Sequence, residues 1–239
     1  MNQEALLDWY ERNKRPLPWR LDPSPWSILL SEILLQQTQM ERGIEYHERL
    51  LKRFPTLSSM AKSSVDDVLL LWQGAGYYSR ARRLHALSIE VVEVHGGVLP
   101  NTYDELLKLP GIGPYTAAAV ASIAFSEPVA CVDGNIRRVM ARQSNLDEPS
   151  MKEVQTFADE QLLVEVPGDW NQAMMELGAL VCKPRNPLCE QCPVAETCQG
   201  RSRSHALPRP KKIKKTIVEY DCIVRIDENG APELQQRPQ

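Results

Sequence analysis

The 239-residue sequence lacks two features that would each indicate a class of protein at once. No apolar run approaches the ~18 residues that a membrane-spanning helix needs, so no membrane partner is expected. Positive charge is not in excess, because the formal net charge is −3. The molecule as a whole is therefore not a basic nucleic-acid binder, and any affinity for nucleic acid must come from local patches.

The N-terminal segment MNQEALLDWYERNK lacks the apolar core of a secretory signal, because it is charged and amphipathic. We therefore expect a cytoplasmic protein, nucleoid-associated if its source is bacterial. In such a reducing compartment disulfides are rare.

Strand patterns are also missing before residue 215. Apolar residues instead recur at helical spacing, as in 28–34, 65–72 and 84–94, and glycines and prolines separate these stretches. The pattern predicts an all-α fold of about ten helices with short connections.

The character of the chain changes after residue 200. Residues 201–215 carry seven lysines and arginines together with prolines, which predicts a basic linker. Thr216–Ile226 alternates and is β-branched, which predicts a strand, and a second strand is expected near Glu233. A lone hairpin is not stable in water, so 216–239 is expected to be the opening of a β-containing domain that is cut short.

The most informative segment is LPGIGPYTAAAV, which begins at Leu109. Gly111 and Gly113 can adopt positive φ and allow another backbone to approach, and Pro114 suits a first helical turn. The free N–H groups of a helix start beside such a turn form a phosphate-binding site. Taken alone, the segment could equally be a loop between two core helices.

Four of the six cysteines have the spacing C-x6-C-x2-C-x5-C. They are Cys182, Cys189, Cys192 and Cys198. Four thiolates this close suit a tetrahedral metal ion or an iron–sulfur cubane. Zinc ribbons usually have two CxxC pairs, whereas only one is present, and the uneven spacing favours an object larger than one ion. A zinc site and free structural thiols are the alternatives. Cys131 and Cys222 are expected to be buried small hydrophobes.

Two arginine clusters are candidate basic patches. Arg80, Arg82 and Arg83 form one, and Arg137 and Arg138 form the other. Each is either a DNA contact or a solvated surface, and the neighbouring glycine turns favour the DNA interpretation.

The hairpin LPGIGPYT, the aspartate of VDGN and the cysteine spacing together resemble the helix-hairpin-helix DNA glycosylases with a [4Fe-4S] cluster, the endonuclease III superfamily. The likeness covers most of residues 5–200. Four more segments, LPWR, SEILLQQTQ, GAGYYSRARRL and NQAMMELGA, resemble the MutY-type adenine DNA glycosylases of this superfamily.

The resemblance implies two helical subdomains that flank a DNA cleft. The six-helix subdomain with the hairpin would span 19–133, and the iron–sulfur subdomain would join 1–18 to 134–200. Residues 216–239 would be the remnant of a Nudix-like C-terminal domain. The implied molecule is a monomer that binds double-stranded DNA containing A:8-oxoguanine or A:G mispairs.

The implied activity is monofunctional removal of adenine from these mispairs, leaving an abasic site. One alternative is another glycosylase of the superfamily, specific for thymine glycol or G:T mismatches. The other is a non-catalytic iron–sulfur DNA-binding protein, against which Glu32 and Asp133 argue because binding alone needs neither.

The expected catalytic residues follow from the chemistry of adenine, which is a poor leaving group unless its ring is protonated. Glu32 lies in an apolar helix, where burial would keep it protonated as the general acid; the alternative is an exposed helix charge. Asp133 would stabilise the cationic sugar, cap the next helix, or do both, with Asn135 orienting it. Tyr115 stands where strand-cleaving relatives have a lysine and would bond to the carboxylates.

The resemblance also implies the DNA contacts. Gln37 and Tyr77 would fill the space left by the extruded base, with Leu35 and Thr38 close by. The adenine pocket would be lined by Arg20, Trp19 and Glu176, for which plain packing is the alternative. The phosphate contacts would come from Gly111, Gly113, Lys183 and Arg185.

Overall fold

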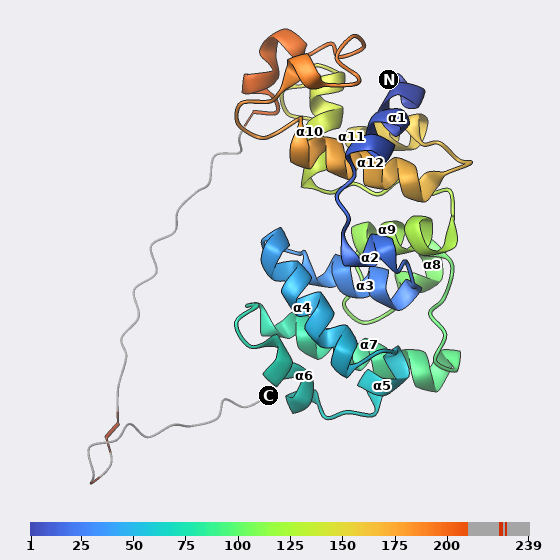
Figure 1. Cartoon of the computed structure of the whole chain (residues 1–239), viewed down its shortest axis with the longest axis vertical. Helices are drawn as coiled ribbons and strands as arrows, with labels where there is room; N and C mark the ends of the chain where they lie inside the picture. The colour runs from blue at the N-terminus through green and yellow to red at the C-terminus, as the bar shows by residue number, and fades with distance from the viewer. Residues whose placement is uncertain (210–224, 227, 229–239) are drawn as a thin grey trace. The chain divides into compact units, whose positions relative to one another are not determined.

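The computed structural model describes residues 1–209, 225–226 and 228. The chain divides into two compact units, Met1–Arg209 and Pro210–Gln239. The predicted strands, the Nudix-like remnant and Cys222 lie almost wholly outside the described residues. The first unit contains every helix of the described part and is drawn in colour in Figure 1.

One group of helices, which we call the hairpin lobe, runs from α2 to α9 and occupies the lower part of Figure 1. Its helices are α2 (Pro18–Leu21), α3 (Pro25–Leu34), α4 (Met40–Arg53), α5 (Leu57–Ala61), α6 (Val65–Trp72), α7 (Tyr78–His95), α8 (Tyr103–Leu106) and α9 (Pro114–Phe125). Hydroxyl side chains set several of the starts, because the oxygens of Thr56 and Ser64 accept backbone N–H groups in capping boxes of α5 and α6. The hairpin LPGIGP joins α8 to α9.

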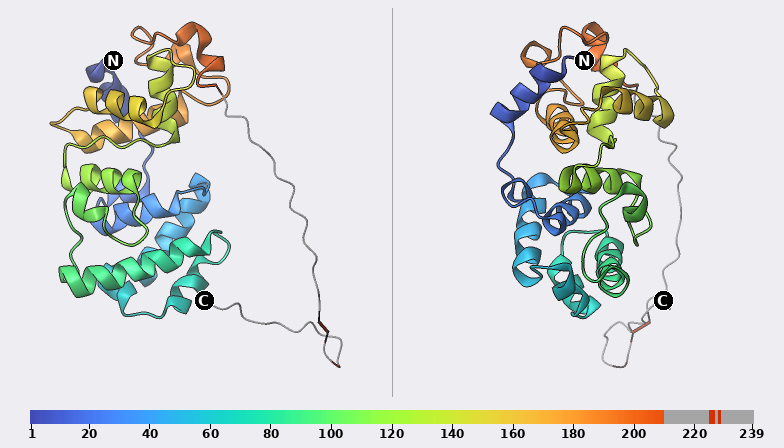
Figure 2. Two further views of the ribbon diagram at one scale, coloured as in Figure 1. Left: turned by 180° about the vertical axis from the view of Figure 1, so that it is seen from behind. Right: turned by 90° about the vertical axis from the view of Figure 1, so that its right-hand side faces the viewer.

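The second group, which we call the cluster lobe, combines the first helix with the last ones (Figures 1 and 2). It contains α1 (Gln3–Asn13), α10 (Gly134–Gln143), α11 (Met151–Gln161) and α12 (Pro167–Leu180), and the 3₁₀ helices η1 (Cys189–Gln191) and η2 (Arg201–Ala206). Segments more than a hundred residues apart in the sequence thus pack side by side, α1 against α12.

Two hydrophobic cores meet at α9. Ala117, Val120 and Ala121 belong to the core of the hairpin lobe, whereas Ala118 and Ala119 belong to the core of the cluster lobe. The small side chains let α3 and α12 pack on opposite sides of this helix. The two lobes are therefore joined through one buried helix.

The all-α fold is confirmed, with two corrections. The described residues form twelve α-helices rather than about ten, because α2, α5 and α8 are too short to show a full apolar period. The predicted linker is wrong for its first residues: 201–206 form η2, and Leu207 is buried with its carbonyl bonded to Arg142. None of the described helices has the length and apolar character needed to cross a bilayer.

Close packing of α12 on α10 gives the first prediction. A Cβ on Gly178 would lie 2.6 Å from the Cβ of Asn135. We expect Gly178→Ala to lower the free energy of unfolding by about 1–3 kcal/mol in urea denaturation, despite the better helix propensity of alanine. Gly134→Ala in α10 is the control, because a Cβ there meets nothing within 4 Å. Equal stability of the two variants would contradict the prediction.

Candidate active site

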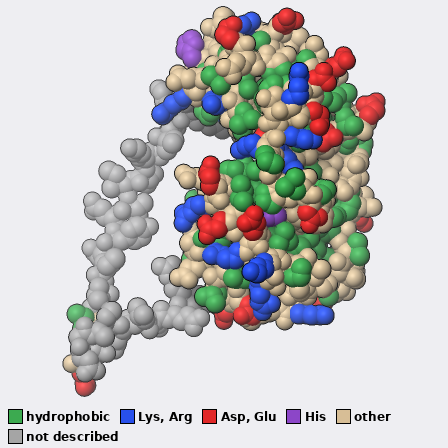
Figure 3. Space-filling view, viewed as in Figure 1, with side chains coloured by type: hydrophobic (Ala, Val, Ile, Leu, Met, Phe, Trp, Pro, Cys, Tyr) green, Lys and Arg blue, Asp and Glu red, His purple; other side chains and the backbone are tan. Residues whose placement is uncertain are grey.

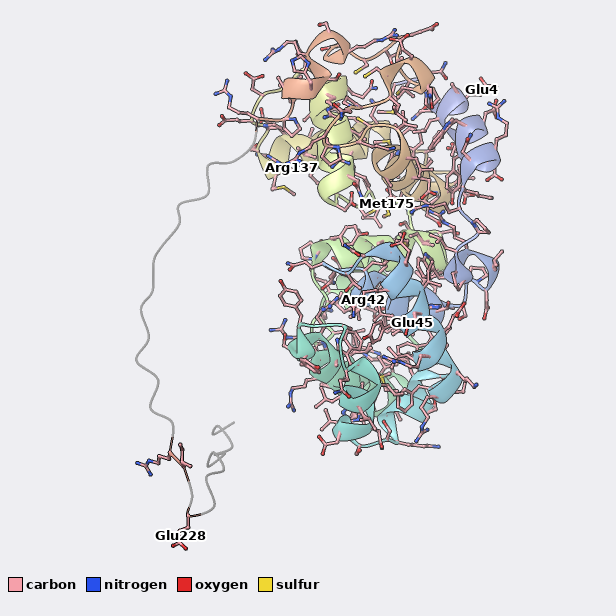
Figure 4. All side chains as sticks on the ribbon, turned by 60° about the vertical axis from the view of Figure 1, so that its left-hand side comes forward. Glu4, Arg42, Glu45, Arg137, Met175 and Glu228 are labelled. Atoms are coloured by element: carbon pink, nitrogen blue, oxygen red, sulfur yellow. The ribbon has the colours of Figure 1, made fainter. Side chains whose placement is uncertain are left out.

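A cavity of about 360 Å³ lies between the two lobes within the first unit. Helices α2, α3, α9 and α12 and the segment before α10 contribute its walls. Met175, labelled in Figure 4, lines it from the edge of α12 that faces the hairpin lobe. The predicted residues that line this cavity are Trp19, Arg20, Glu32, Leu35, Thr38, Tyr115, Asp133, Asn135 and Glu176.

Glu32 is buried in the wall of this cavity, with 8% of its surface exposed, so the alternative of an exposed helix charge is wrong. Its neighbours on α3 from Trp26 to Leu34 are all buried. Burial raises the pKa of Glu32 to about 7, and the nearby Asp133 adds to this, against the lowering effect of a hydrogen bond from Tyr115. That bond runs from the phenol to Oε2 over 2.7 Å and leaves Oε1 for a proton.

Asp133 is the N-cap of α10, as one sequence interpretation held. Its Oδ1 accepts the backbone N–H of Ile136 at 2.7 Å, and its Oδ2 accepts the side-chain amide of Asn135 at 2.8 Å. Burial raises the pKa of Asp133, while these two hydrogen bonds act in the opposite direction. Capping and catalysis are compatible here, because the helix start favours the ionised form. Among the described residues Tyr115 bonds to Glu32 and not to Asp133.

Glu176 lines the cavity, but its carboxylate is engaged by two arginines. Arg15 donates to both oxygens, at 2.7 and 2.9 Å, and Arg20 donates to Oε2 at 3.1 Å. Burial alone would raise the pKa of Glu176, yet these bonds lower it to about 2. Glu176 is therefore an ionised anchor for the two arginines. Arg20 also donates to Gln172, at 3.0 Å.

The sequence interpretation missed Arg15, Gln36, Gln172 and Met175, which also line the cavity. Three of them lie inside the segments SEILLQQTQ and NQAMMELGA, so the signal was present but not resolved to single residues. Arg15 precedes LPWR and carries no local signal, because its partner Glu176 lies 161 residues away.

The remaining predicted DNA contacts lie outside the cavity. Gln37 and Tyr77 are exposed, Tyr77 by 60%, and both have left-handed backbones, with φ of 59° and 48°. Gly111 has φ of 80°, and a Cβ there would lie 2.8 Å from that of Arg83. Gly113, in contrast, is extended and open, with φ of −101° at the N-cap of α9, so positive φ was wrong for this residue.

The arginine clusters are mostly structural. Arg80 is buried and bonds to backbone carbonyls, so it is neither a DNA contact nor a solvated charge. Arg82 and Arg83 remain exposed. Arg138 donates to the carbonyls of Cys182 and Gly178 and to Asn135, and Arg137 bonds to the carbonyl of Pro149. Over the face in Figure 3 the basic side chains are interspersed with acidic ones rather than gathered in one field.

The four predicted cysteine ligands line one cavity in the cluster lobe and are free thiols. No three His, Cys, Asp or Glu side chains of the described residues are arranged to hold a single metal ion. Donors surround the sulfurs, because Arg142 reaches Cys182 Sγ at 3.3 Å and the backbone of Val194 bonds to Cys192. Four thiols with N–H donors fit an iron–sulfur cluster.

The loop between the first two ligands is held by the buried Arg142. Its Nη1 donates to the carbonyl of Lys183 at 2.7 Å, and its Nη2 to that of Pro184 at 3.2 Å. The side chains of Lys183 and Arg185 are exposed on this loop. Cys131 is buried, as expected of a small hydrophobe.

Comparisons with known families place this fold and site in a class. Residues 30–162, more than half of the chain, match the model described as HhH-GPD superfamily base excision DNA repair protein. Residues 182–198 match the iron–sulfur binding domain of endonuclease III, which confirms the predicted iron–sulfur cofactor over the zinc alternative. The chain belongs to the HhH-GPD superfamily of base excision DNA repair proteins.

Individual relatives refine this class. The human adenine DNA glycosylase is 46% identical over 83% of this chain and 39% of its own length. The Schizosaccharomyces pombe adenine DNA glycosylase is 36% identical over 94% of this chain and 54% of its own. The chain thus spans about half the length of the curated relatives it matches. These matches confirm the resemblance to MutY-type enzymes.

Solved structures share the fold. A thermostable thymine-DNA glycosylase matches with a TM-score of 0.78 and 27% identity, over 84% of this chain and 95% of that one. Endonuclease III in a non-covalent complex with DNA matches with a TM-score of 0.72 over 84% of this chain and 94% of its own. Its 24% identity supports the fold alone.

The buried ion group gives the second prediction. Glu176→Gln leaves Arg15 and Arg20 without their anion, so we expect urea denaturation at pH 7 to show a loss of about 3–5 kcal/mol. The pKa of Glu176 is about 2 in the folded protein, below its value in the unfolded chain. The ionised carboxylate therefore contributes its full stability at any pH above the unfolded pKa. As the pH falls toward 2, the difference in unfolding free energy between Glu176→Gln and the wild type should become smaller. Glu11→Gln, which removes an exposed pair with Lys14, should cost no more than about 1 kcal/mol. Equal losses would contradict the prediction.

Proposed function

We propose that this protein is a DNA glycosylase that removes adenine mispaired with 8-oxoguanine or guanine in double-stranded DNA. The observation that carries the proposal is the meeting of Glu32 and Asp133 in one cavity, the first with a pKa near 7 and the second held at a helix start. The names of the relatives support adenine as the base. In this proposal the protein is a monomer.

Glu32 is the general acid. A carboxyl with a pKa of about 7 is protonated in about half of the molecules at neutral pH and can donate to N7 of adenine as the glycosidic bond breaks. The Tyr115 hydroxyl holds the side chain through Oε2, and Oε1 is then the oxygen that carries the proton. The protonated ring then leaves as neutral adenine.

Asp133 stabilises the sugar. As the base departs, positive charge develops on C1′ and O4′, and an anion beneath the ring lowers the energy of this state. Asn135 and the N–H of Ile136 hold both carboxylate oxygens of Asp133 in place. Water is the final acceptor, because Tyr115 has no amine with which to form a Schiff base.

The target adenine must leave the duplex to enter this cavity. Gln37 and Tyr77, both exposed, are the side chains proposed to fill the vacated stack. Trp19, Arg20 and Leu35 line the pocket that receives the base. Gly111, Gly113, Lys183 and Arg185 face the phosphates. The iron–sulfur cluster, held by the four cysteines, would support the loop that carries Lys183 together with Arg142 and would take no part in the chemistry.

The four cysteines would hold the cluster in the cluster lobe, next to this machinery. Arg138 connects the two places, because it bonds to the carbonyl of Cys182 and, through Asn135, to Asp133. The cluster domain thereby supports the position of Asp133.

The competing function is removal of a pyrimidine, since a thymine-DNA glycosylase shares the fold. The base released from matched duplexes separates the two functions. We expect free adenine from A:8-oxoguanine under single-turnover conditions, and no release of the lesion from thymine-glycol or G:T duplexes. The product strand should stay intact until alkali is added. Release of a pyrimidine, or nicking without alkali, would overturn the assignment.

The pH profile tests the proposed acid. Because Glu32 must be protonated, the single-turnover rate should fall about tenfold per pH unit above about pH 7. Asp133 must be ionised, so the rate should also fall in acid. Glu32→Gln should lose about 10²–10⁴-fold and lack the alkaline decline.

Glu45→Gln on α4, labelled in Figure 4, is the matched control, because this carboxylate is exposed and outside the cavity. Its rate and pH profile should equal those of the wild type. An unchanged rate in Glu32→Gln would exclude Glu32 as the acid.

A further inference from the structure

Gln37 and Tyr77 come from two loops with one buried side chain between them. The first loop, residues 35–39, joins α3 to α4, and the second loop, residues 73–77, joins α6 to α7. Left-handed backbones are costly for residues with side chains and persist only where the surroundings hold them. Neither loop contains a helix or strand whose own hydrogen bonds would hold the backbone in this conformation.

The guanidinium of Arg80 bonds to both loops. Its Nη1 donates to the carbonyls of Ile33 at 2.9 Å, Leu34 at 3.0 Å and Gln36 at 2.5 Å. Its Nη2 reaches the hydroxyl of Thr38 at 3.2 Å and, across the gap, the carbonyls of Ala75 at 3.3 Å and Gly76 at 3.4 Å. The residue before Tyr77 and both neighbours of Gln37 are thus tied to one planar group.

The charge of Arg80 has no carboxylate partner among the described residues. The side chain is 8% exposed, and its guanidinium lies within 5.5 Å of the ring centres of Trp72 and Tyr77. Its charge is met by the last carbonyls of α3, the negative end of the helix dipole. Burying a cation without an anionic partner is expensive, and simple packing would not require it.

We propose that Arg80 is a positioning residue that locks the two loops together, so that Gln37 and Tyr77 enter the DNA stack as one rigid unit. The proposal rests on the function proposed above for these two residues. Arg80 itself touches no DNA. A lysine cannot replace it, because an ammonium is a compact point charge that cannot span both loops as the planar fork does.

The first test uses the free protein and needs no activity. Amide hydrogen exchange should rise by about tenfold or more in both loops of Arg80→Lys. Val91→Ala, a core change eleven residues farther along α7, should lower the melting temperature without loosening either loop. Loosening of one loop only, or of neither, would overturn the proposal.

The second test is a double-mutant cycle on single-turnover excision of adenine. Gln37→Ala and Tyr77→Ala should be strongly non-additive in the wild-type background, since residues that act as a unit fail together. The Arg80→Lys variant should itself excise adenine about 10²-fold more slowly than the wild type. In this background the rate losses of Gln37→Ala and Tyr77→Ala should multiply, as they do for independent residues. Losses that multiply in both backgrounds would overturn the coupling.

The two tests separate the inference from the function on which it rests. A wild-type protein that releases no adenine, while both loops loosen in Arg80→Lys, would remove the proposed function and leave the locking role of Arg80 in place. If the wild-type protein releases adenine but hydrogen exchange in both loops is unchanged in Arg80→Lys, the proposed function stands and the locking role of Arg80 is excluded.

Discussion

Burial of the single carboxyl of Glu32 is the interaction on which the candidate site depends. The helix α3 is buried along almost its whole length, so Glu32 has little water to stabilise its charge. Its pKa therefore rises to about 7, and Tyr115 at the start of α9 holds one oxygen. Without this burial the second carboxylate, Asp133, would face a permanent anion, and the proposed division into acid and stabiliser would be lost.

The buried charged side chains of this protein also connect segments that are distant in the sequence. Glu176 on α12 draws Arg15 and Arg20 from the other end of the sequence onto the cavity wall. Arg142 and Arg80 have no carboxylate partner among the described residues and donate instead to backbone carbonyl groups of loops and, for Arg80, of the end of α3. In each case one side chain bonds to a segment that is distant from it in the sequence. Each of these side chains lies beside a proposed functional element. Glu176 lies at the base pocket, Arg142 at the cluster loop and Arg80 at the DNA-inserting loops.

The sequence predicted the parts whose signals are local. Helical periodicity predicted the all-α fold, and the apolar run around Glu32 predicted its burial. Cysteine spacing favoured a cluster over a single metal ion, and the family resemblance then implied [4Fe-4S]. It could not place Arg80, because an arginine on a helix is most often solvated, and the carbonyl partners on α3 and the loop after it lie more than 40 residues away. Arg15 escaped for the same reason, because its partner Glu176 lies 161 residues away. Long-range pairing of charges leaves no periodic pattern in the sequence. Short helices such as α2 contain too few residues to show a helical period.

The shared helix α9 explains how two lobes can hold one reaction centre. Glu32 comes from the hairpin lobe and Asp133 from the start of α10 in the cluster lobe, so their separation depends on the packing between lobes. That packing runs through Ala117–Ala121, whose side chains are divided between the two cores. A bulkier residue there would push the carboxylates apart and weaken their repulsion, which in turn would lower the pKa of Glu32. The small residues of α9 thus help to set the pKa of Glu32, which lies on α3.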